Sequence, residues 1–351
     1  MEKVYFVMVD KVSAEKTRRL LLDESLFNKD YAVLKDKDKV LLPLIKKYNK
    51  IKSLDSNNIK YKLAIREVGK LENVKVDYLS ELREILNDDD YNSLVKGYDL
   101  LGNIIILDIP DSLIKYEKRI AKVFLKSNKN VETVLKKNGP VEGIYRVRPI
   151  KYVLGKHSFM ANYKENGCEF VFDVRKVFFS IRLAYERNRI SNLISDNENV
   201  CVPFAGVGPF AIEISKKHPN TNIVAIELNK YGYFYMKKNI KLNNLNNIKP
   251  VLADFNEFAK TCDKKFDRIV MPMPKSSLSF LDSAFKLSKN NTFVHIYTFC
   301  ESDKIDEVKS MILKHAKDNN YKVEFKLIRK VRTYSKSIIE IVVDYKIVSN
   351  F

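Results

Sequence analysis

Cysteine is scarce in this sequence, and long apolar runs, internal repeats and low-complexity tracts are missing. The four cysteines include no pair at CxxC spacing, so we expect neither a disulfide framework nor a zinc knuckle, and no metal. No run of 18 or more apolar residues exists, and the N-terminus lacks the apolar stretch of a signal peptide. These absences predict a cytoplasmic protein without a membrane partner, or for a eukaryotic source also a nuclear or mitochondrial one.

Acidic residues are outnumbered by basic ones. The 63 Lys and Arg against 44 Asp and Glu give a formal net charge of +19, which attracts polyanions. The excess is concentrated in residues 101–250, which contain 25 Lys and Arg and 13 Asp and Glu. Residues 51–100, by contrast, contain 8 Lys and Arg and 10 Asp and Glu. Exposed cations bind phosphates by releasing counterions, so nucleic acid is the expected partner. A codon bias toward lysine and asparagine is the alternative explanation.

The first 60 residues predict a small domain followed by a linker. An apolar run from Lys3 to Val9 indicates a strand, a helix is expected to begin at Ser13, and Val33 to Leu44 is typical of a strand or hairpin. The polar stretch 48–60 has the composition of a linker. We therefore place the first domain at residues 1–60.

Residues 61–174 predict a second small α+β domain. A helix is expected over Leu79 to Leu86, and LGNIIILDI, Leu101 to Ile109, indicates a buried strand. Short alternating segments between 130 and 174 are typical of an antiparallel sheet.

Residues 175–351 have a different rhythm. A helix-like segment over 175–194 is followed by apolar runs at 199–204, 222–227, 248–252, 267–271 and 292–299, most of them separated by helical stretches. Strands that alternate with helices predict a parallel, doubly wound sheet. The β-rich runs 321–330 and 337–348 are expected to pair antiparallel at one edge of it.

The segment VCVPFAGVGPFAIEIS carries a cofactor signature. Gly206, Gly208 and Ala211 match G-x-G-x-x-A, a turn that brings backbone close to a ligand at a helix N-terminus. Glu227 ends the next strand and can accept both ribose hydroxyls of an adenosine cofactor, and Asp254 follows a third strand. Each acid alone could instead cap a helix. An NAD-dependent oxidoreductase is the competing interpretation, although no histidine lies in a pattern suited to hydride transfer.

Several motifs together carry a family resemblance. FAGVGPF is preceded by DVRKVFFSIRLAYERNRI and followed by IELN and DRIVMPMPKSSLSFLDSA, and GNIIILDIP, EGIYRVRPI and IEIVVDYKIV occur at matching places. This set resembles the Trm-five-type tRNA (guanine-37-N1)-methyltransferases of archaea and eukaryotes, nearly end to end. The resemblance implies a Rossmann-like class I methyltransferase domain at 175–351, a tRNA-recognition domain at 1–60 and an RNA-binding domain at 61–174. It also implies S-adenosylmethionine as cofactor, tRNA as substrate, contacted at its anticodon stem-loop and tertiary core, and a monomer.

The resemblance also assigns site residues. Glu186 corresponds to a general base for the guanine N1 proton and Arg146 to a cation that stabilises the charge developing on the base. From the residues alone, Glu186 could instead form an ion pair with Arg182 or Arg189 on the same helix. The positions that correspond to the cofactor pocket are Arg187, Phe204, Ala205, Gly206, Gly208, Glu227, Leu228, Asp254, Phe255, Pro272 and Pro274.

Two departures affect the acceptor side. Pro272-Met273-Pro274 stands where most members have Asn-Leu-Pro, and Ile181 replaces a proline. Methylation of the C7 carbon of 4-demethylwyosine at position 37, alone or in addition, is therefore the first alternative, and a non-catalytic tRNA-binding protein is the alternative from another class. A base that leaves its stack needs a pocket lined by aromatic side chains, for which the candidates are Tyr145, Phe178 and Phe179, and each could equally be core.

Overall fold

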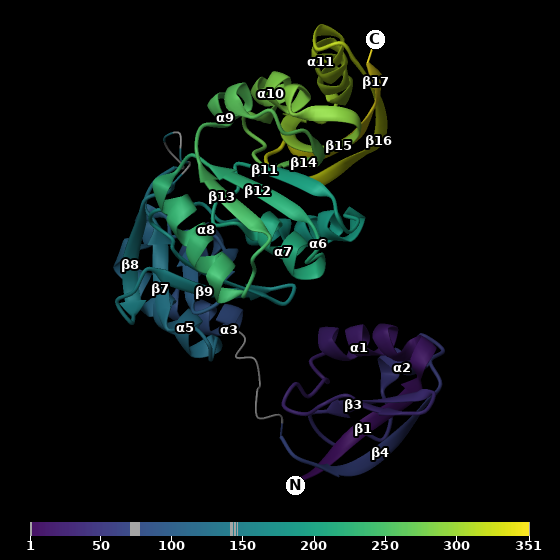
Figure 1. Ribbon diagram of the computed structural model, residues 1–351. Helices are drawn as coiled ribbons and strands as arrows, with labels where there is room; N and C mark the ends of the chain where they lie inside the picture. Colours follow the sequence, from purple (N-terminus) through teal and green to yellow (C-terminus); the bar gives the residue numbers. More distant parts are fainter. Residues whose placement is uncertain (1, 71–77, 141–142, 144, 146, 351) are drawn as a thin grey trace. The chain divides into compact units, whose positions relative to one another are not determined.

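The computed structural model describes residues 2–70, 78–140, 143, 145 and 147–350. The chain divides into two compact units, Met1–Asp77 and Tyr78–Phe351, each with a buried core of its own (Figure 1). Within the described residues, no helix is long and apolar enough to cross a membrane.

The first unit is an antiparallel sheet in the order β2-β3-β1-β4 with helices on one face. Its elements are β1 (Glu2–Asp10), α1 (Ala14–Asp23), β2 (Leu34–Asp36), β3 (Lys39–Leu44), α2 (Lys52–Ser56) and β4 (Tyr61–Val68). Alternate residues of β1 point to opposite faces, so Val7 packs with Leu21 of α1 while Phe6 joins Leu41 on the other side.

The boundary expected at residue 60 is wrong. Strand β4 pairs with β1 over its whole length, from Glu2 opposite Val68 to Val9 opposite Tyr61, and so it belongs to the first unit. The stretch that looked like a linker contains α2, whose Leu54 is buried in the core. Most β4 side chains are exposed, because it lies at the edge of the sheet, and therefore its sequence lacks the apolar signal of a core strand.

The second unit begins with a sheet in the order β5-β6-β7-β8. Its elements are α3 (Tyr78–Ile85), α4 (Asp88–Ser93), β5 (Tyr98–Leu101), β6 (Ile104–Leu107), α5 (Glu117–Ser127), β7 (Thr133–Lys137) and β8 (Ile150–Gly155). The strand expected over 101–109 is divided by a turn at Gly102, whose φ is +61° and where a Cβ would lie 1.7 Å from the Asn162 carbonyl oxygen. Within residues 130–174, β7 pairs antiparallel with β8, as predicted. Strand β6, which precedes that range, pairs parallel with β7, so the sheet as a whole is mixed.

A hairpin joins this sheet to the C-terminal one. Strands β9 (Met160–Glu165) and β10 (Cys168–Asp173) pair with each other, and α8 (Lys230–Leu242) packs against β10. The side chain of Asn239 accepts a hydrogen bond from the Val171 amide at 2.8 Å, and Asn243 accepts one from the Glu169 amide at 2.9 Å. A continuous core therefore runs from β6 through the hairpin into the C-terminal sheet.

The C-terminal sheet has the order β13-β12-β11-β14-β15-β17-β16. Its elements, besides α8, are α6 (Ala184–Leu193), β11 (Asn199–Pro203), α7 (Pro209–Lys217), β12 (Asn222–Glu227), β13 (Ile248–Leu252), α9 (Phe255–Thr261), β14 (Phe266–Met271), α10 (Leu281–Lys286), β15 (Ser288–Glu301), α11 (Ile305–Asp318), β16 (Tyr321–Thr333) and β17 (Ile338–Asn350). The five neighbouring strands from β13 through β12, β11 and β14 to β15 pair parallel. Strands β17 and β16 pair antiparallel and complete one edge. This arrangement confirms the expected doubly wound sheet. The strand order reverses between β11 and β14.

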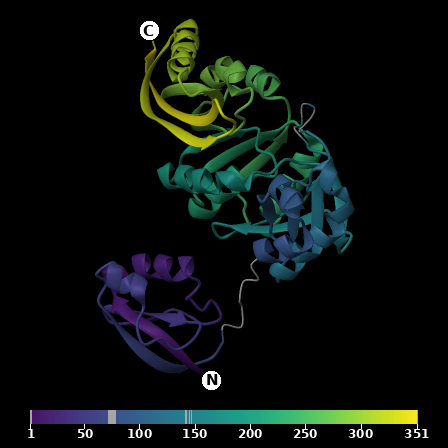
Figure 2. The same ribbon diagram turned by 180° about the vertical axis from the view of Figure 1, so that it is seen from behind.

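Helices cover both faces of this sheet (Figures 1 and 2). Val200 and Val202 of β11 pack on the side of α6, α7 and α8, whereas Cys201 packs with α9, α10 and α11. The helix expected over 175–194 is shorter: α6 follows a 3-10 turn, Ile181–Leu183. The non-helical residues before that turn form walls of the cavities described below.

Candidate active site

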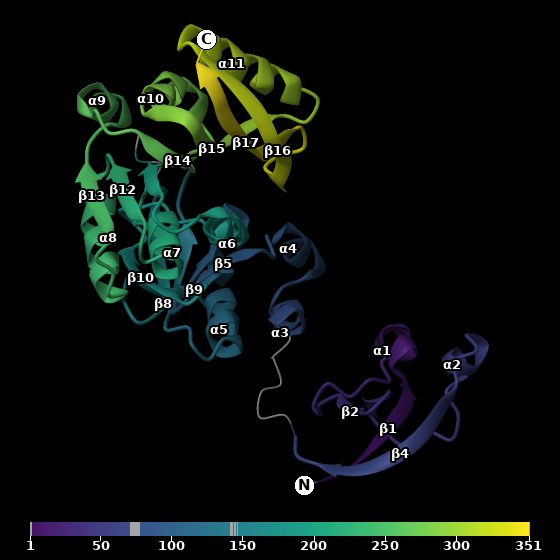
Figure 3. The same cartoon turned by 45° about the vertical axis from the view of Figure 1, so that its right-hand side comes forward.

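A cavity of about 430 Å³ lies beside the carboxyl ends of β11 and β12 and the N-terminus of α7. This is the place where the strand order reverses, which is where ligands bind in open α/β sheets. Figure 3 shows α7 next to β12 in this part of the chain. The cavity is lined by Tyr145, Val177, Phe178, Phe179, Ser180, Leu183, Arg187, Phe204, Ala205, Gly206, Val207, Pro209, Phe210, Ile226, Glu227, Leu228, Asn229, Gly232, Ala253, Asp254, Phe255, Pro272, Met273, Ser276, Ser279 and Phe280.

The loop from β11 to α7 adopts a backbone that glycine favours. Gly206 has φ +59° and Gly208 has φ +92°, and a Cβ at Gly208 would approach Ile212 and Met236 side-chain atoms to 3.1 Å. Phe204 holds a φ of +56° without being glycine, a conformation that costs about 1–3 kcal/mol and is typical of functional sites. This strained residue directs its ring into the cavity wall.

Phe204 belongs to an aromatic cluster on one side of the cavity. Its ring centroid lies 5.5 Å from that of Phe255, at the start of α9, and 4.8 Å from that of Phe280. All three rings line the cavity, which gives it a broad apolar wall. Phe280 lies within the SLSF segment, and sequence reasoning did not single it out.

Glu227 connects the end of β12 to the glycine loop. Its Oε2 accepts a hydrogen bond from the Gly206 amide at 2.6 Å, and its Oε1 accepts one from the Asn229 amide at 2.7 Å. Burial raises the pKa of Glu227, and these amide donors act in the opposite direction. The Leu228 amide acts in the same direction as these two donors. A carboxylate offers about four lone-pair positions, so acceptor capacity remains for a ligand.

Asp254 caps α9 and also lines the cavity. One carboxylate oxygen accepts from the amides of Asn256 at 2.8 Å and Glu257 at 3.2 Å. The helix-capping alternative is therefore observed for this acid, and its other oxygen accepts neither of these amides. Leu228, also predicted at the site, is an exposed side chain on the cavity wall.

Arg187 is buried and connects α6 with β9 and α7 through ion pairs. Its guanidinium forms a two-bond ion pair with Glu165 of β9 and lies 3.5 Å from Glu213 of α7. Burial and the neighbouring Glu165 raise the pKa of Glu213 to about 8. Arg187 lines the cavity, but a ligand would meet a guanidinium already engaged by carboxylates.

Glu186, Gly208 and Pro274 are not among the described residues that line this cavity, and Arg146 lies outside the described residues. Gly208 shapes the loop instead, because a side chain at this position would crowd Ile212 and Met236. The Pro274 carbonyl accepts a hydrogen bond from the Phe299 amide at 3.1 Å, which joins the loop after β14 to the end of β15.

Glu186 is 1% exposed and lies in a buried ion-pair network. It accepts hydrogen bonds from Arg189 at 2.9 Å and from the Tyr297 hydroxyl at 2.8 Å, and it forms an ion pair with Arg329 of β16. The ion-pair alternative with Arg189 is therefore present in the structure, while Arg182 pairs with Asp99 instead. The role of Glu186 as a general base stays a prediction.

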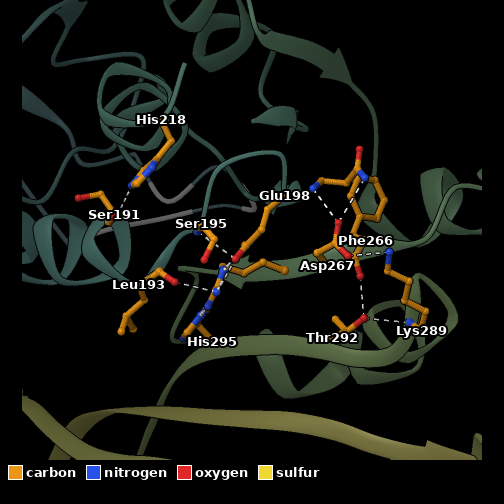
Figure 4. A network of polar contacts seen from close by, with 12 residues as sticks. Ser191, Leu193, Ser195, Glu198, His218, Phe266, Asp267, Lys289, Thr292 and His295 are labelled. Atoms are coloured by element: carbon orange, nitrogen blue, oxygen red, sulfur yellow. Dashed lines mark hydrogen bonds and ion pairs between the residues drawn. The ribbon is translucent and has the colours of Figure 1, made fainter. Parts of the chain in front are cut away.

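The network continues through the sheet. Arg189 pairs with Asp344 of β17, which lies 2.8 Å from His295, and His295 contacts Arg268 at 2.8 Å. Figure 4 shows the far end of this network, around Glu198 and His295. Burial lowers the pKa of His295, and Asp344 acts in the opposite direction.

Comparisons with known proteins show which families the parts of this chain resemble. The TRM5/TYW2 methyltransferase domain matches residues 161–324, the TYW2 N-terminal domain matches 79–158, and the tRNA methyltransferase 5 N-terminal domain matches 7–52. The tRNA (guanine(37)-N(1))-methyltransferase Trm5b of Pyrococcus abyssi is 31% identical over 97% of this chain and 98% of its own length.

Two further relatives bear on the site. The tRNA (guanine(37)-N(1))/4-demethylwyosine(37)-methyltransferase Taw22 of Nanoarchaeum equitans is 31% identical over 65% of this chain and 94% of its own length. A solved complex of aTrm5 with tRNALeu has a TM-score of 0.70 and 30% identity and covers 98% of this chain and 99% of its own. With a relative above 30% identity that spans nearly the whole length, this chain belongs to the Trm5 family of tRNA (guanine(37)-N1)-methyltransferases.

Proposed function

We propose that this protein transfers a methyl group from S-adenosylmethionine to N1 of guanosine 37 in tRNA. The observation that carries the proposal is the end-to-end likeness to relatives named for this reaction, across all of the matched domains. The cavity at the reversal of strand order supplies a site of suitable place and composition.

The cavity fits the cofactor on three counts. Glu227 keeps free acceptor positions for the ribose hydroxyls, the glycine loop lets backbone approach at the N-terminus of α7, and the cluster of Phe204, Phe255 and Phe280 offers an apolar wall for an adenine ring. When bound, S-adenosylmethionine supplies an electrophilic methyl group on sulfur. Asp254 would accept from the adenine amino group through the oxygen that does not cap α9.

The target base would lie against Phe178 and Tyr145, both exposed on the cavity wall. An extruded base stacks on such rings and excludes water from the reacting atoms. Phe179 fits this role less well, because its ring stacks on buried Phe172 at 4.9 Å and packs against the Arg187 guanidinium. Phe179 therefore belongs mainly to the core.

Glu186 is the proposed acceptor of the N1 proton. Glu186 lies in the first turn of α6, between Leu183 of the preceding 3-10 turn and Arg187 of α6. Leu183 and Arg187 are four residues apart and both line the cavity, so Glu186 lies close to the helix face that borders it. In this structure its carboxylate faces Arg189, Tyr297 and Arg329. Action as a base therefore requires that the carboxylate first separate from at least one of these partners.

The RNA partner follows from charge and from family. Residues 101–250, which carry the excess of basic residues, also supply much of the lining of the cavity. Phosphate binding by basic residues needs no particular sequence. Contacts with the anticodon stem-loop and the tertiary core, a monomeric state and a cytoplasmic location stay predictions.

Methylation of a 4-demethylwyosine carbon is a second candidate. Pro272, in place of the expected asparagine, lines the cavity, so the acceptor side offers one amide fewer to orient a guanine. The Nanoarchaeum equitans relative is named for both reactions. A tricyclic base also presents a larger ring surface to Phe178 and Tyr145 than guanine does.

Mass spectrometry of nucleosides tests the proposal. Three RNAs are incubated with enzyme and S-adenosylmethionine: a tRNA transcript with guanosine at position 37, a matched transcript with adenosine there, and tRNA that carries the tricyclic precursor. We expect 1-methylguanosine in the guanosine transcript and no methylation of the adenosine control. Methylation of the precursor alone would replace the proposal by the second candidate, and no methylation of any RNA despite cofactor binding would reject both. Tight binding of NAD in place of S-adenosylmethionine would favour an oxidoreductase.

A further inference from the structure

A larger cavity, of about 800 Å³, adjoins the first one. The two share a wall formed by Val177, Phe178, Phe179 and Ser180, the non-helical residues before α6. The rest of the wall includes residues of the sheet of β5 to β8, of β10 and β15, of the loop after β14, and of the turn between β16 and β17. Neither the cofactor nor the target base, as proposed above, accounts for this second space.

The loop after β14 faces both cavities. Pro272, Met273 and Ser276 line the smaller one, while Lys275 lines the larger one. The Phe299 amide, hydrogen-bonded to Pro274, holds this loop beside the larger cavity, where the Phe299 ring is part of the wall. If the target base enters the smaller cavity, a nucleotide next to it in the RNA strand would therefore lie beside Lys275 and Phe299.

The turn between β16 and β17 places an exposed aromatic ring at the larger cavity. Tyr334 is 61% exposed, and its ring centroid lies 4.5 Å from that of Phe299. The Tyr334 and Ser335 amides both donate to the Ile338 carbonyl, at 2.9 and 3.1 Å, so the turn has a defined backbone. An exposed ring of this kind can serve as a platform on which a nucleic-acid base stacks.

The charges around the larger cavity favour an anionic occupant. Lys137 and Arg182 are already close to Asp99, and Arg332 pairs with buried Glu340 at 2.5 Å. For Lys275 and Arg148, by contrast, the described parts of the chain contain no ion-pair partner. One nucleotide would suit this arrangement: its phosphate can meet Lys275 and Arg148, and its base can stack on exposed Tyr334, beside half-buried Phe299.

We propose that the larger cavity holds a nucleotide that flanks the target base in the RNA strand, with its base stacked on Tyr334 and its phosphate near Lys275 and Arg148. This inference rests on the proposed function, since it takes the RNA strand to enter at the smaller cavity. Sequence-tolerant stacking and phosphate contact would hold the loop while the target base is extruded. Tyr334 is then a residue that binds substrate outside the reacting centre.

Fluorescence of a base analogue tests the inference directly. Two full-length tRNA transcripts carry 2-aminopurine, one at position 36 and one at 38, and each is titrated with wild type, Tyr334→Ala, Tyr334→Phe and the control Tyr231→Ala. Tyr231 is a matched control because it is another exposed tyrosine and is not among the described residues that line either cavity. We expect one of the two transcripts to be quenched by wild type, Tyr334→Phe and the control, and much less by Tyr334→Ala.

Binding and methylation give the second readout. Stacking contributes about 1–3 kcal/mol per base, so Tyr334→Ala should weaken tRNA binding by about 5- to 150-fold while S-adenosylmethionine affinity and the thermal midpoint stay unchanged. Lys275→Gln should reduce the slope of log affinity against log salt by about 0.7, as expected for one phosphate contact to a single strand.

The outcomes separate the two proposals. If wild type methylates guanosine 37 and Tyr334→Ala matches it in quenching and tRNA affinity, the inference is overturned while the proposed function stands. If quenching depends on Tyr334 but no RNA is methylated, the binding site stands and the proposed reaction fails.

Discussion

Substitution of Glu227 by alanine is the sharpest perturbation of the cofactor site. The change removes the acceptor for the Gly206 and Asn229 amides, at 2.6 and 2.7 Å, and the acceptor proposed for two ribose hydroxyls. Hydrogen bonds to a charged group contribute about 1.5–3 kcal/mol each, so the loss of two ligand bonds corresponds to about 10²- to 10⁴-fold in affinity. Removal of a buried carboxylate whose pKa is raised by burial offsets part of the stability cost, so the thermal midpoint should fall little.

Isothermal titration of S-adenosylmethionine measures this effect, with tRNA binding measured in parallel. Glu227→Gln keeps the size of the side chain and one acceptor, and should fall between wild type and alanine. The matched control is Glu257→Gln on α9, an exposed acid that pairs with Lys260 and is not among the described residues that line the cavity.

We expect the control to bind cofactor like wild type and all variants to bind tRNA equally. Equal cofactor affinity in wild type and Glu227→Ala would refute the assignment of the ribose to this acid. A parallel loss of tRNA affinity and of thermal stability would instead show that Glu227 acts mainly by holding the Gly206 loop.

Three further predictions concern the chemistry, the RNA and the buried network. Glu186→Gln should lower the single-turnover methylation rate by about 10²- to 10⁴-fold with cofactor and tRNA affinities unchanged; a lower thermal midpoint at an unchanged rate would assign Glu186 to the ion-pair network alone. The logarithm of tRNA affinity should fall linearly with the logarithm of salt concentration, and a flat dependence would count against phosphate contacts. Burial depresses the folded-state pKa of His295 below 6.5, so its contribution to stability is present above pH 6.5 and is lost as pH falls through the folded pKa. Thermal midpoints of His295→Gln should therefore depend less on pH below 6.5 than those of wild type, and parallel curves would contradict this.

The parallel sheet was predictable because its strands are buried on both faces. Continuous apolar runs such as VCV and IVAI need no partner to be recognised, and the strand-to-loop glycines mark the ligand edge. Strand β4 was not predictable from the sequence, because an edge strand keeps polar side chains and is specified by hydrogen bonds to β1. The turn at Gly102 was also hidden, since its need for glycine arises from the Asn162 carbonyl, which lies about 60 positions along the chain.

The site residues at the carboxyl ends of parallel strands were predictable from the sequence. Glu227 is the last residue of β12 and Asp254 lies two positions after β13, so their place at the cavity follows from topology alone. The environment of Glu186 could not be predicted in this way, because Arg329 and Tyr297 contact it from strands more than a hundred residues later in the chain. Helix spacing could suggest the contact with Arg189 but could not show that the carboxylate is buried.

The strand pairing of the first unit has a consequence for how such a protein can change over time. Every strand described in residues 2–70 pairs within its own sheet, and the sheets described from residue 78 onward take no strand from it. A recombination event near residue 77 would therefore cut no ladder of hydrogen bonds and open no core. The segment can be gained, lost or exchanged between genes as a whole, and the two units are free to evolve at different rates.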